Sequence, residues 1–389
     1  MKITNIITQW IKVPYNRPFY PTWFPGRAES HQSIFLVRIQ TDEGYEGWGS
    51  TECPFSLAPT YIQMVQDIVA SWLIGQDPTM VERLAFKLKG DARLACRTWT
   101  IENALWDLFG KICNQPTYKV LGAYREKILA YAAWSEMRSH EERREDAQRL
   151  VDEGWKGVKL RIFANTIKQD IAEVENIRKA VGDKLAIMVD ANQGVVRDRN
   201  FCDNGVPFWT YERALKTAKE LEQLDVEWLE EPLDHYDYYG LSRLTEHTDI
   251  AIAGGEIYHG IGEHKILIES NCYDIIQPNL SMVGGFSQLR KIAVLAEHHG
   301  NKMCNIHGWT PGVGVAANVH FMCSIPNATW LEVPYDAPAI LPENFQGIVK
   351  DPLVINPKDG CLYPTQKSGF GIELDEDIIK KYLVLEKQF

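Results

Sequence analysis

Three carboxylates in the middle of the chain each follow a short hydrophobic run: Asp190, Glu230 and Glu256. Each run is apolar, partly β-branched and followed by a helical pattern, which is typical of a buried parallel strand. In α/β barrels the residues at the carboxyl ends of such strands carry the chemistry. Carboxylates that converge from successive strands repel one another unless a cation lies between them, and oxygen ligands suit a hard ion such as Mg²⁺. The pattern therefore predicts a magnesium site.

Three basic side chains lie near the ends of other predicted strands. Lys159 and Arg161 are two residues apart, so both are expected to point into the barrel from one strand. A guanidinium is almost always protonated, which makes Arg161 a poor base and a good clamp for a carboxylate. His307 closes another hydrophobic run and is the candidate for moving protons near neutral pH.

These residues require a scaffold in which many strand ends meet. From about residue 126 strand and helix patterns alternate, which favours an α/β fold, a (β/α)8-type barrel or a close variant, over a doubly wound sheet. We predict its strands at 128–134, 157–162, 186–192, 226–230, 250–256, 273–278, 302–307 and 328–333. We predict three units: an N-terminal α+β capping domain at 1–125, the barrel at 126–350, and a C-terminal segment at 351–389 that returns to the capping domain.

Composition narrows the class of partner. The 389 residues carry 52 acids against 41 bases, a net charge of -11, which disfavours nucleic acid because phosphate contacts need a basic surface. The eight cysteines include no Cys-x-x-Cys pair, so we expect reduced thiols in a cytoplasmic protein. No apolar run approaches the length of a membrane span. A small-molecule substrate is the expected partner.

One connection is unusually long. Residues 193–209 separate the run that ends at Asp190 from the next helical pattern, on the predicted catalytic face. Long loops on that face commonly act as lids or subunit contacts. A neutral surface insertion is an equally good interpretation. We expect its aromatic side chains to cover the site or a neighbouring subunit, so that deletion of 198–206 alters substrate affinity or assembly.

Several motifs occur in a fixed order at the predicted strand ends and in the capping domain. They are Ile101–Lys111, Gly157–Arg161, Asp190–Gln193, Trp228–Pro232, Gly254–Glu256, Gln277–Asn279, Gly284–Gly285, Asn305–His307 and Leu331–Val333. By these motifs nearly the whole chain resembles the enolase superfamily, and within it the mandelate racemase-like group with its acid-sugar dehydratases. In that family Mg²⁺ holds a substrate carboxylate, a base removes the proton α to it, and the metal stabilises the resulting enediolate.

The resemblance implies a role for each candidate. It makes Asp190, Glu230 and Glu256 the metal ligands, and it favours Glu230 over its neighbour Glu231, since alternation along a strand lets only one of the two face the barrel mouth. It makes His307 the acid or base, and Glu332 the group that binds the substrate carboxylate. The further residues that it marks are Lys159, Arg161 and Asn279 as catalytic, and Tyr20, Trp23, Arg27 and Asn192 as substrate-binding.

Two departures from the family pattern shape the expected reaction. Arg161 stands where many relatives have a second lysine, and Asn279 stands where they have the aspartate that pairs with the histidine. An arginine argues against a symmetric two-base racemase, and an amide does not stabilise imidazolium by charge. We therefore expect a Mg²⁺-dependent dehydratase of an aldonate or aldarate that gives a 2-keto-3-deoxy acid. The alternatives are a 2-hydroxy-acid racemase or epimerase, and a non-catalytic descendant. Relatives commonly form dimers or octamers, which implies a homo-oligomer.

Overall fold

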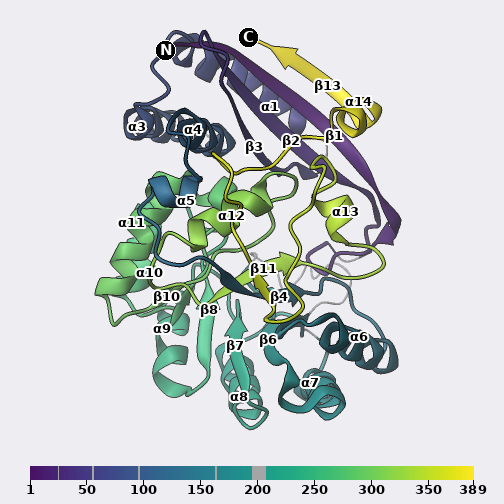
Figure 1. The fold of residues 1–389 in the computed structure, drawn as a ribbon. Coiled ribbons are helices and arrows are strands. Elements are labelled where there is room, and N and C mark those ends of the chain that lie inside the picture. Colours follow the sequence, from purple (N-terminus) through teal and green to yellow (C-terminus); the bar gives the residue numbers. More distant parts are fainter. Residues whose placement is uncertain (25, 55–56, 95–96, 163, 195–206) are drawn as a thin grey trace.

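The computed structural model describes residues 1–24, 26–54, 57–94, 97–162, 164–194 and 207–389. A sheet flanked by helices stands over a larger, curled sheet in the ribbon (Figure 1). Most of the loop expected at 193–209, including all of 198–206, lies outside the described residues. At the loop's end Trp209 is buried, with 1% of its surface exposed.

The capping unit is built on a four-stranded antiparallel sheet of order β13-β1-β2-β3. Its strands are β1 (Ile3–Phe19), β2 (Glu29–Thr41), β3 (Glu46–Glu52) and β13 (Leu383–Gln388). Its helices are α1 (Ala58–Met64), α2 (Ser71–Leu73), α3 (Val81–Ala92), α4 (Trp99–Ile112) and α5 (Thr117–Val120), with a π-helical turn at Val65–Ala70. Because β13 pairs with β1, the two ends of the chain lie close together at the top of Figure 1.

The second sheet confirms the predicted fold class. Eight parallel strands follow the order β10-β9-β8-β7-β6-β5-β4-β11 and curl into a barrel. They are β4 (Ile128–Ala133), β5 (Gly157–Arg161), β6 (Ala186–Asp190), β7 (Val226–Glu230), β8 (Ala251–Gly254), β9 (Ile275–Ile276), β10 (Met303–Cys304) and β11 (Trp330–Pro334). A short antiparallel strand, β12 (Cys361–Leu362), pairs with β4.

Helices alternate with the barrel strands. They are α6 (His140–Glu153), α7 (Ile167–Val181), α8 (Tyr211–Glu222), α9 (Tyr238–His247), α10 (Gly260–Glu269), α11 (Gly285–His298) and α12 (Gly314–Met322), followed by α13 (Pro342–Phe345) and α14 (Glu376–Tyr382). The first two begin at capping boxes, with Ser139 and Thr166 accepting from the backbone three residues on. These local signals fix where the helices start and hence how long each connection from a strand end is.

Two predicted strands are much shorter than expected. We predicted 273–278 and 302–307, whereas β9 and β10 have two residues each. The backbone still runs alongside, since Asn305 N donates to Ile276 O at 3.0 Å and His307 N donates to Pro278 O at 3.0 Å. Proline has no N–H to donate in return, so the ladder is not completed. His307 therefore lies three residues beyond the end of β10 rather than at its last position.

The sheet does not close by strand pairing in the described part of the chain, because β10 and β11 stand at its two ends without a ladder between them. The side chain of Asn305 bridges them instead. Its Oδ1 accepts from Thr329 N at 2.9 Å and from Trp330 N at 3.2 Å, and its Nδ2 donates to Thr329 Oγ1 at 3.0 Å. We call this junction the seam.

Strand periodicity stacks the barrel interior in layers. Tyr131, Met188, Trp228 and Ile275 form one hydrophobic cluster inside it. Two residues further along their strands, side chains on the same face are polar: Glu230 follows Trp228, and Asp190 follows Met188. The apolar layer thus forms the floor of the candidate site.

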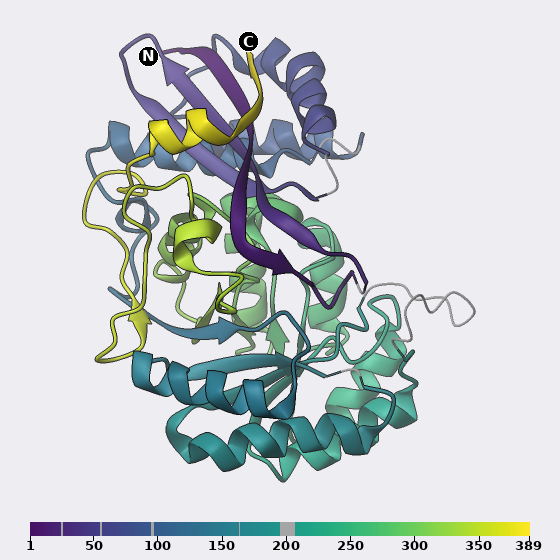
Figure 2. The ribbon, with the colours of Figure 1, turned by 90° about the vertical axis from the view of Figure 1, so that its right-hand side faces the viewer.

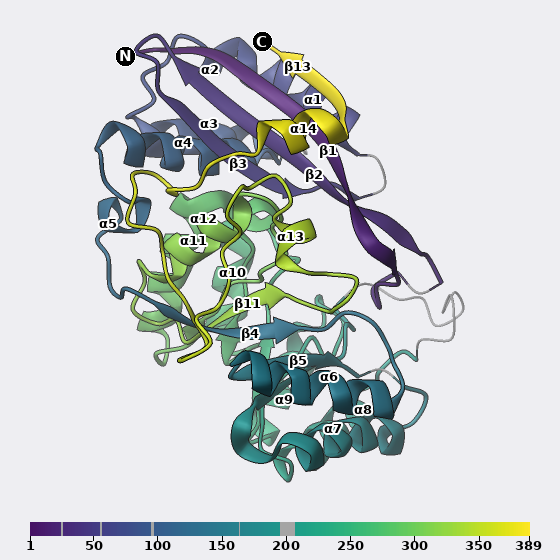
Figure 3. The same cartoon turned by 45° about the vertical axis from the view of Figure 1, so that its right-hand side comes forward.

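The long strand β1 reaches from the capping sheet down towards the barrel, as Figures 2 and 3 show. Its far end is fastened there by Arg17, which pairs with Glu136 just after β4. Tyr20 N also donates to Glu136 Oε1 at 2.9 Å, and Thr22 N donates to Ser135 O at 3.0 Å. These bonds hold residues 20–24 at the end of β4 and β5.

Candidate active site

Lys159 is the centre of the buried polar layer. Its side chain is fully buried, and Nζ lies 2.6 Å from Glu230 Oε1, 2.7 Å from Glu332 Oε1 and 3.5 Å from Asp190 Oδ2. Burial lowers the pKa of Lys159, but the charges of Glu230 and Glu332 outweigh it and raise the pKa above its ordinary value. The lysine is therefore charged, and its ammonium group lies close to carboxylates from three other strands.

Arg161 lies two residues on, at the end of the same strand. It is level with Asp190 in the β5–β6 ladder and makes an ion pair with it. Its Nε donates to Trp134 O at 3.1 Å, and its Nη1 donates to Asn192 Oδ1 at 3.2 Å. The ring of Trp23 lies 5.4 Å from the guanidinium carbon. Arg161 is thus held as a fixed charge next to residues 20–24 of the capping unit, which we call the docked segment.

Glu230 ends β7 and is buried beside Asp190, its register partner on β6. Besides Lys159 it accepts from Gln277 Nε2 at 2.9 Å and Trp228 Nε1 at 3.2 Å. Burial alone raises the pKa of Glu230, but Lys159 and Arg161 outweigh it and hold the pKa below its usual range. Glu230 is therefore ionised.

Glu231 does not point away from the site as strict alternation predicts. The strand ends at Glu230, and Glu231 has a left-handed backbone with φ of 44°. Its carboxyl is buried against Gly194, and Oε2 has no hydrogen-bond partner among the residues that the structure describes. Burial, then the charges of Glu256 and Glu230, raise the pKa of Glu231. Alternation thus gives no reason to prefer one of the two glutamates as a ligand.

Glu256 and His307 face each other across the mouth. Gly255 has φ of 128°, a conformation open to glycine, and this turn follows the end of β8. Glu256 Oε2 lies 3.0 Å from His307 Nε2, and Glu332 Oε2 lies 3.8 Å from the same nitrogen. Burial raises the pKa of Glu256, although His307 opposes the shift.

The hydrogen bonds of Asn279 determine which nitrogen of His307 carries the proton. Asn279 Oδ1 accepts from Ser281 N at 2.8 Å and from Met282 N at 3.1 Å, which fixes the orientation of the amide. Its Nδ2 therefore points at His307 Nδ1, 3.0 Å away. An amide N–H only donates, so Nδ1 accepts and the neutral imidazole carries its hydrogen on Nε2. That hydrogen points into the site.

Of the four residues expected to bind substrate, two lie at the site and two have exposed side chains. Trp23 packs edge-on against Trp309, with ring centroids 4.7 Å apart, and Asn192 contacts Arg161. Both lie next to the buried polar layer around Lys159 and Arg161. Tyr20 keeps 53% of its surface exposed, and Arg27 is exposed as well. The structure therefore brings Trp23 and Asn192 to the site and leaves the side chains of Tyr20 and Arg27 at its outer rim.

Several residues of the candidate site were not predicted from the sequence. Gln277 donates to Glu230, Trp309 packs on the docked segment, and Glu136 fastens β1. A signal existed for Gln277, because it stands two residues before Asn279 and so shares the inner face. No spacing reveals Glu136, which meets Arg17 across 119 residues of sequence.

The three carboxylates predicted as metal ligands line one mouth but do not form a ready cage. In the described ranges no three acidic, histidine or cysteine side chains are close enough together to hold a metal ion. Nitrogen atoms of basic side chains stand against the same oxygens instead: Arg161 at Asp190, Lys159 at Glu230 and His307 at Glu256. The ligand assignment stays a prediction.

Comparison with known proteins identifies the family. Residues 8–122 match the mandelate racemase/muconate lactonizing enzyme N-terminal domain, and residues 142–378 match the enolase C-terminal domain-like model. The chain therefore belongs to the mandelate racemase/muconate lactonizing enzyme group of the enolase superfamily.

Its relatives catalyse several reactions. It is 28% identical to an arabinonate dehydratase of Saccharolobus solfataricus, over 92% of each chain. It is also 28% identical to a D-galactarolactone cycloisomerase of Agrobacterium fabrum, over 98% of this chain and 99% of the relative. The L-talarate dehydratase of Polaromonas sp. JS666, solved with Mg and L-glucarate, superposes with a TM-score of 0.85 at 26% identity, covering 100% of this chain and 98% of that one. In the described part of the chain no helix is long and apolar enough to cross a membrane.

Proposed function

We propose that the chain is a Mg²⁺-dependent dehydratase of an acid sugar, an aldonate or aldarate. It removes the proton α to the carboxylate and eliminates the 3-hydroxyl, giving a 2-keto-3-deoxy acid. Relatives named arabinonate dehydratase and L-talarate/galactarate dehydratase support the substrate class. Relatives named as a cycloisomerase and an epimerase, at comparable identity, make the reaction type the point to test.

The observation that carries the proposal is the hydrogen bond from Asn279 to His307. It leaves the hydrogen of the neutral imidazole on Nε2, so His307 presents a hydrogen-bond donor to the substrate. The departing hydroxyl develops negative charge, which a hydrogen bond from Nε2–H stabilises, and the proton removed from the α-carbon balances the hydroxide as water. A racemase instead needs a base on each face of the α-carbon, and the Nε2–H tautomer is unsuited to that task.

The opposite face is provided by Lys159 and Arg161. Arg161 remains protonated and holds negative charge on the substrate. Lys159 is then the titratable group left on that face, and it can receive the α-proton once it has given up the proton that the charges of Glu230 and Glu332 hold on it in this structure. The two faces differ chemically, which elimination tolerates and racemisation does not.

The donor set fits the magnesium ion that this family uses. Asp190, Glu230 and Glu256 offer only oxygen, as Mg²⁺ prefers. Glu231 keeps a buried oxygen without a hydrogen-bond partner among the described residues, and burial, followed by the charge of Glu230, raises the pKa of Glu256, so a cation would stabilise both carboxylates. A divalent ion held there supplies Lewis-acid stabilisation of charge on the substrate carboxylate.

A substrate screen tests the proposal. The purified protein is incubated with Mg²⁺ in D₂O with a library of aldonates and aldarates, and 2-keto acids and α-deuterium are measured. A Mg²⁺-dependent 2-keto acid supports dehydration. Deuterium exchange without a 2-keto acid would instead identify a racemase or epimerase. The absence of both signals would indicate a non-catalytic protein. The buried charges at Lys159 already argue against that outcome, because charged groups are costly to bury.

A further inference from the structure

A cavity of about 180 Å³ adjoins the catalytic groups on the side of the capping unit, and we call it the inner cavity. Three of its lining residues are tied to that machinery. Ile257 follows Glu256, Trp309 stands two residues after His307, and Ser281 donates from Oγ to Asn279 Oδ1 at 2.9 Å. A substrate whose first carboxylate lies at the barrel mouth therefore has this space for the rest of its chain.

The lining of the inner cavity suits a polyol. Hydroxyl groups are contributed by Thr51, Thr98, Thr100 and Ser281, and the Thr51 and Ser281 hydroxyls bond to each other at 2.7 Å. Trp309 adds an aromatic face. Alternating hydroxyl and C–H groups of a sugar chain match such a surface of polar and apolar patches.

The far end of the inner cavity is positively charged. Of the described residues that line it, Arg97 is the one with a permanent positive charge, and its guanidinium has no hydrogen bond or ion pair within the described ranges. Burial, then the charges of Glu29 and Glu256, raise the pKa of Glu52 to about 8, so this lining acid is mostly uncharged at neutral pH. Arg97 is thus available to a ligand.

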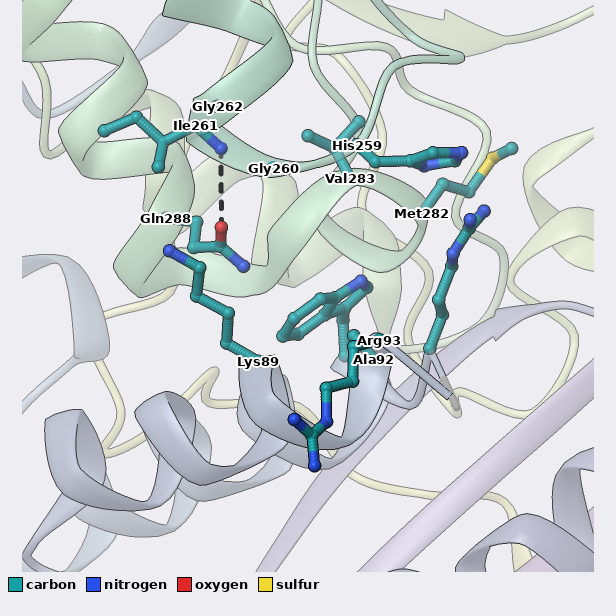
Figure 4. Close-up of a pocket in the computed structure, with 12 residues that line it drawn as sticks. Lys89, Ala92, Arg93, His259, Gly260, Ile261, Gly262, Met282, Val283 and Gln288 are labelled. Carbon is teal, nitrogen blue, oxygen red and sulfur yellow. Dashed lines mark hydrogen bonds between the residues drawn. The ribbon is translucent and has the colours of Figure 1, made fainter. Parts of the chain in front are cut away.

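A second cavity continues beyond Arg97. It has a volume of about 330 Å³, and we call it the outer cavity. It shares Arg97, His259 and Met282 with the inner one and adds Lys89 and Arg93. No acidic side chain is among the residues found to line it, and the first residues of α10 border it. Figure 4 shows Lys89, Arg93 and His259 around this space. Both cavities therefore present positive charge where they meet.

We propose that the substrate carries a second anionic group at its far end, which Arg97 binds. This deepens the proposed function by selecting aldarates, which end in a carboxylate, over aldonates, which end in a hydroxymethyl group. A guanidinium offers a carboxylate two parallel N–H donors, and it offers a neutral hydroxyl no matching charge. Arg97 is accordingly a specificity-determining residue.

Matched substrate pairs test the proposal. We compare galactarate with galactonate, and glucarate with gluconate, for kcat/KM and for the Mg²⁺-dependent rise in Tm that each acid causes. Wild type is expected to favour the diacid. Arg97→Met is expected to lower kcat/KM for the diacid by roughly 10- to 100-fold, the worth of a hydrogen bond to a charged group, and to change the monoacid less than threefold. Arg97→Lys should recover part of the loss.

Lys89→Met is the matched control, since Lys89 lines the outer cavity but not the inner one. It is expected to leave both members of each pair within threefold of wild type. Equal losses on diacid and monoacid in Arg97→Met, or a wild-type preference for monoacids, would overturn the proposal. Inorganic phosphate is a further probe. If it raises Tm through Arg97 without competing with the diacid, the cavity serves a separate anion and the proposal is wrong.

The outcomes separate this proposal from the proposed function. Dehydration of monoacids alone would uphold the function and overturn the role of Arg97. A diacid-selective Tm shift that Arg97→Met abolishes, without any 2-keto acid, would uphold Arg97 and overturn the dehydratase. Because Arg97 is exposed, its substitution is not expected to prevent folding.

Discussion

Replacement of Asn279 by aspartate is expected to change the chemistry of His307 while preserving the local fold. Oδ1 continues to accept from Ser281 N and Met282 N, and the second oxygen replaces the amide nitrogen 3.0 Å from His307 Nδ1. A carboxylate oxygen only accepts, so Nδ1 must carry the hydrogen. The neutral imidazole then presents an unprotonated Nε2 to the substrate, and His307 becomes a base.

The size of the effect follows from two considerations. In the serine-protease triad the reverse change, aspartate to asparagine, leaves the wrong tautomer and costs about 10⁴ in kcat. A carboxylate about 4 Å from an imidazolium adds an attraction of about 4 kcal/mol at an effective dielectric constant near 20. Glu256 already lies 3.0 Å from Nε2, so part of that attraction is present before the substitution. We expect the ratio of α-deuterium exchange to dehydration to rise by about 10- to 1000-fold in Asn279→Asp.

One NMR sample measures both rates, since the loss of the α-proton signal and the appearance of the 2-keto acid are followed together in D₂O. The ¹⁵N shifts of the imidazole report the tautomer directly. Ser281→Ala is the control for the tautomer and for the ratio of the two rates, because it removes one hydroxyl donor to Asn279 and leaves the amide in place, and the loss of a cavity hydroxyl should lower both rates alike. If Asn279→Asp changes neither the tautomer nor the ratio, the amide does not set the protonation of His307, and the reasoning for a hydrogen-bond donor fails.

Four further outcomes are expected. His307→Asn should remove nearly all dehydration while substrate binding, measured calorimetrically, changes much less; substantial residual turnover would place the donor to the leaving hydroxyl elsewhere. Glu230→Gln should abolish metal-dependent turnover, with Glu231→Gln milder, and the opposite ranking in a Mg²⁺ titration would make Glu231 the ligand. Arg161→Lys should remain active or gain α-proton exchange in D₂O; complete inactivity would mean that the guanidinium geometry is essential. Burial raises the pKa of Glu102 to about 7, so its contribution to stability is complete below pH 4.5 and is lost as pH rises towards 7. Relative to Glu102→Gln, the wild-type unfolding free energy should fall by about 3 kcal/mol from pH 4.5 to 8 in urea titrations, and parallel pH profiles would contradict this.

Alternation along strands is enough to bring Lys159, Asp190 and Glu230 together. Each sits at an inward position of a short buried strand, and neighbouring parallel strands end at the same height, so their side chains must meet. The fold class could also be predicted, because strand and helix patterns alternate along the chain. The functional roles of these residues stay predictions, since contact alone does not assign chemistry.

Three features were beyond sequence reasoning, each for a physical reason. The tautomer of His307 depends on backbone donors that fix the Asn279 amide, and spacing does not reveal them. The burial of Glu231 depends on a left-handed backbone, which a periodic pattern does not anticipate. The pairing of Arg17 with Glu136 joins distant segments whose approach is decided by how the capping unit docks.

The seam also lies next to His307, the proposed hydrogen-bond donor to the leaving hydroxyl. His307 follows β10 and Glu332 lies on β11, so the two residues lie on opposite sides of the seam, which Asn305 bridges and no strand ladder closes in the described residues. Gly308 N reaches across it to Glu332 Oε2 at 2.8 Å. The two sides of the seam are therefore joined by a few separate bonds, which include Cys304 N to Asn327 O at 2.8 Å, and not by a continuous ladder. Asn305, which no proposed step uses, holds together the two segments that carry His307 and Glu332, so substitution of Asn305 is expected to alter turnover while leaving every proposed catalytic residue in place.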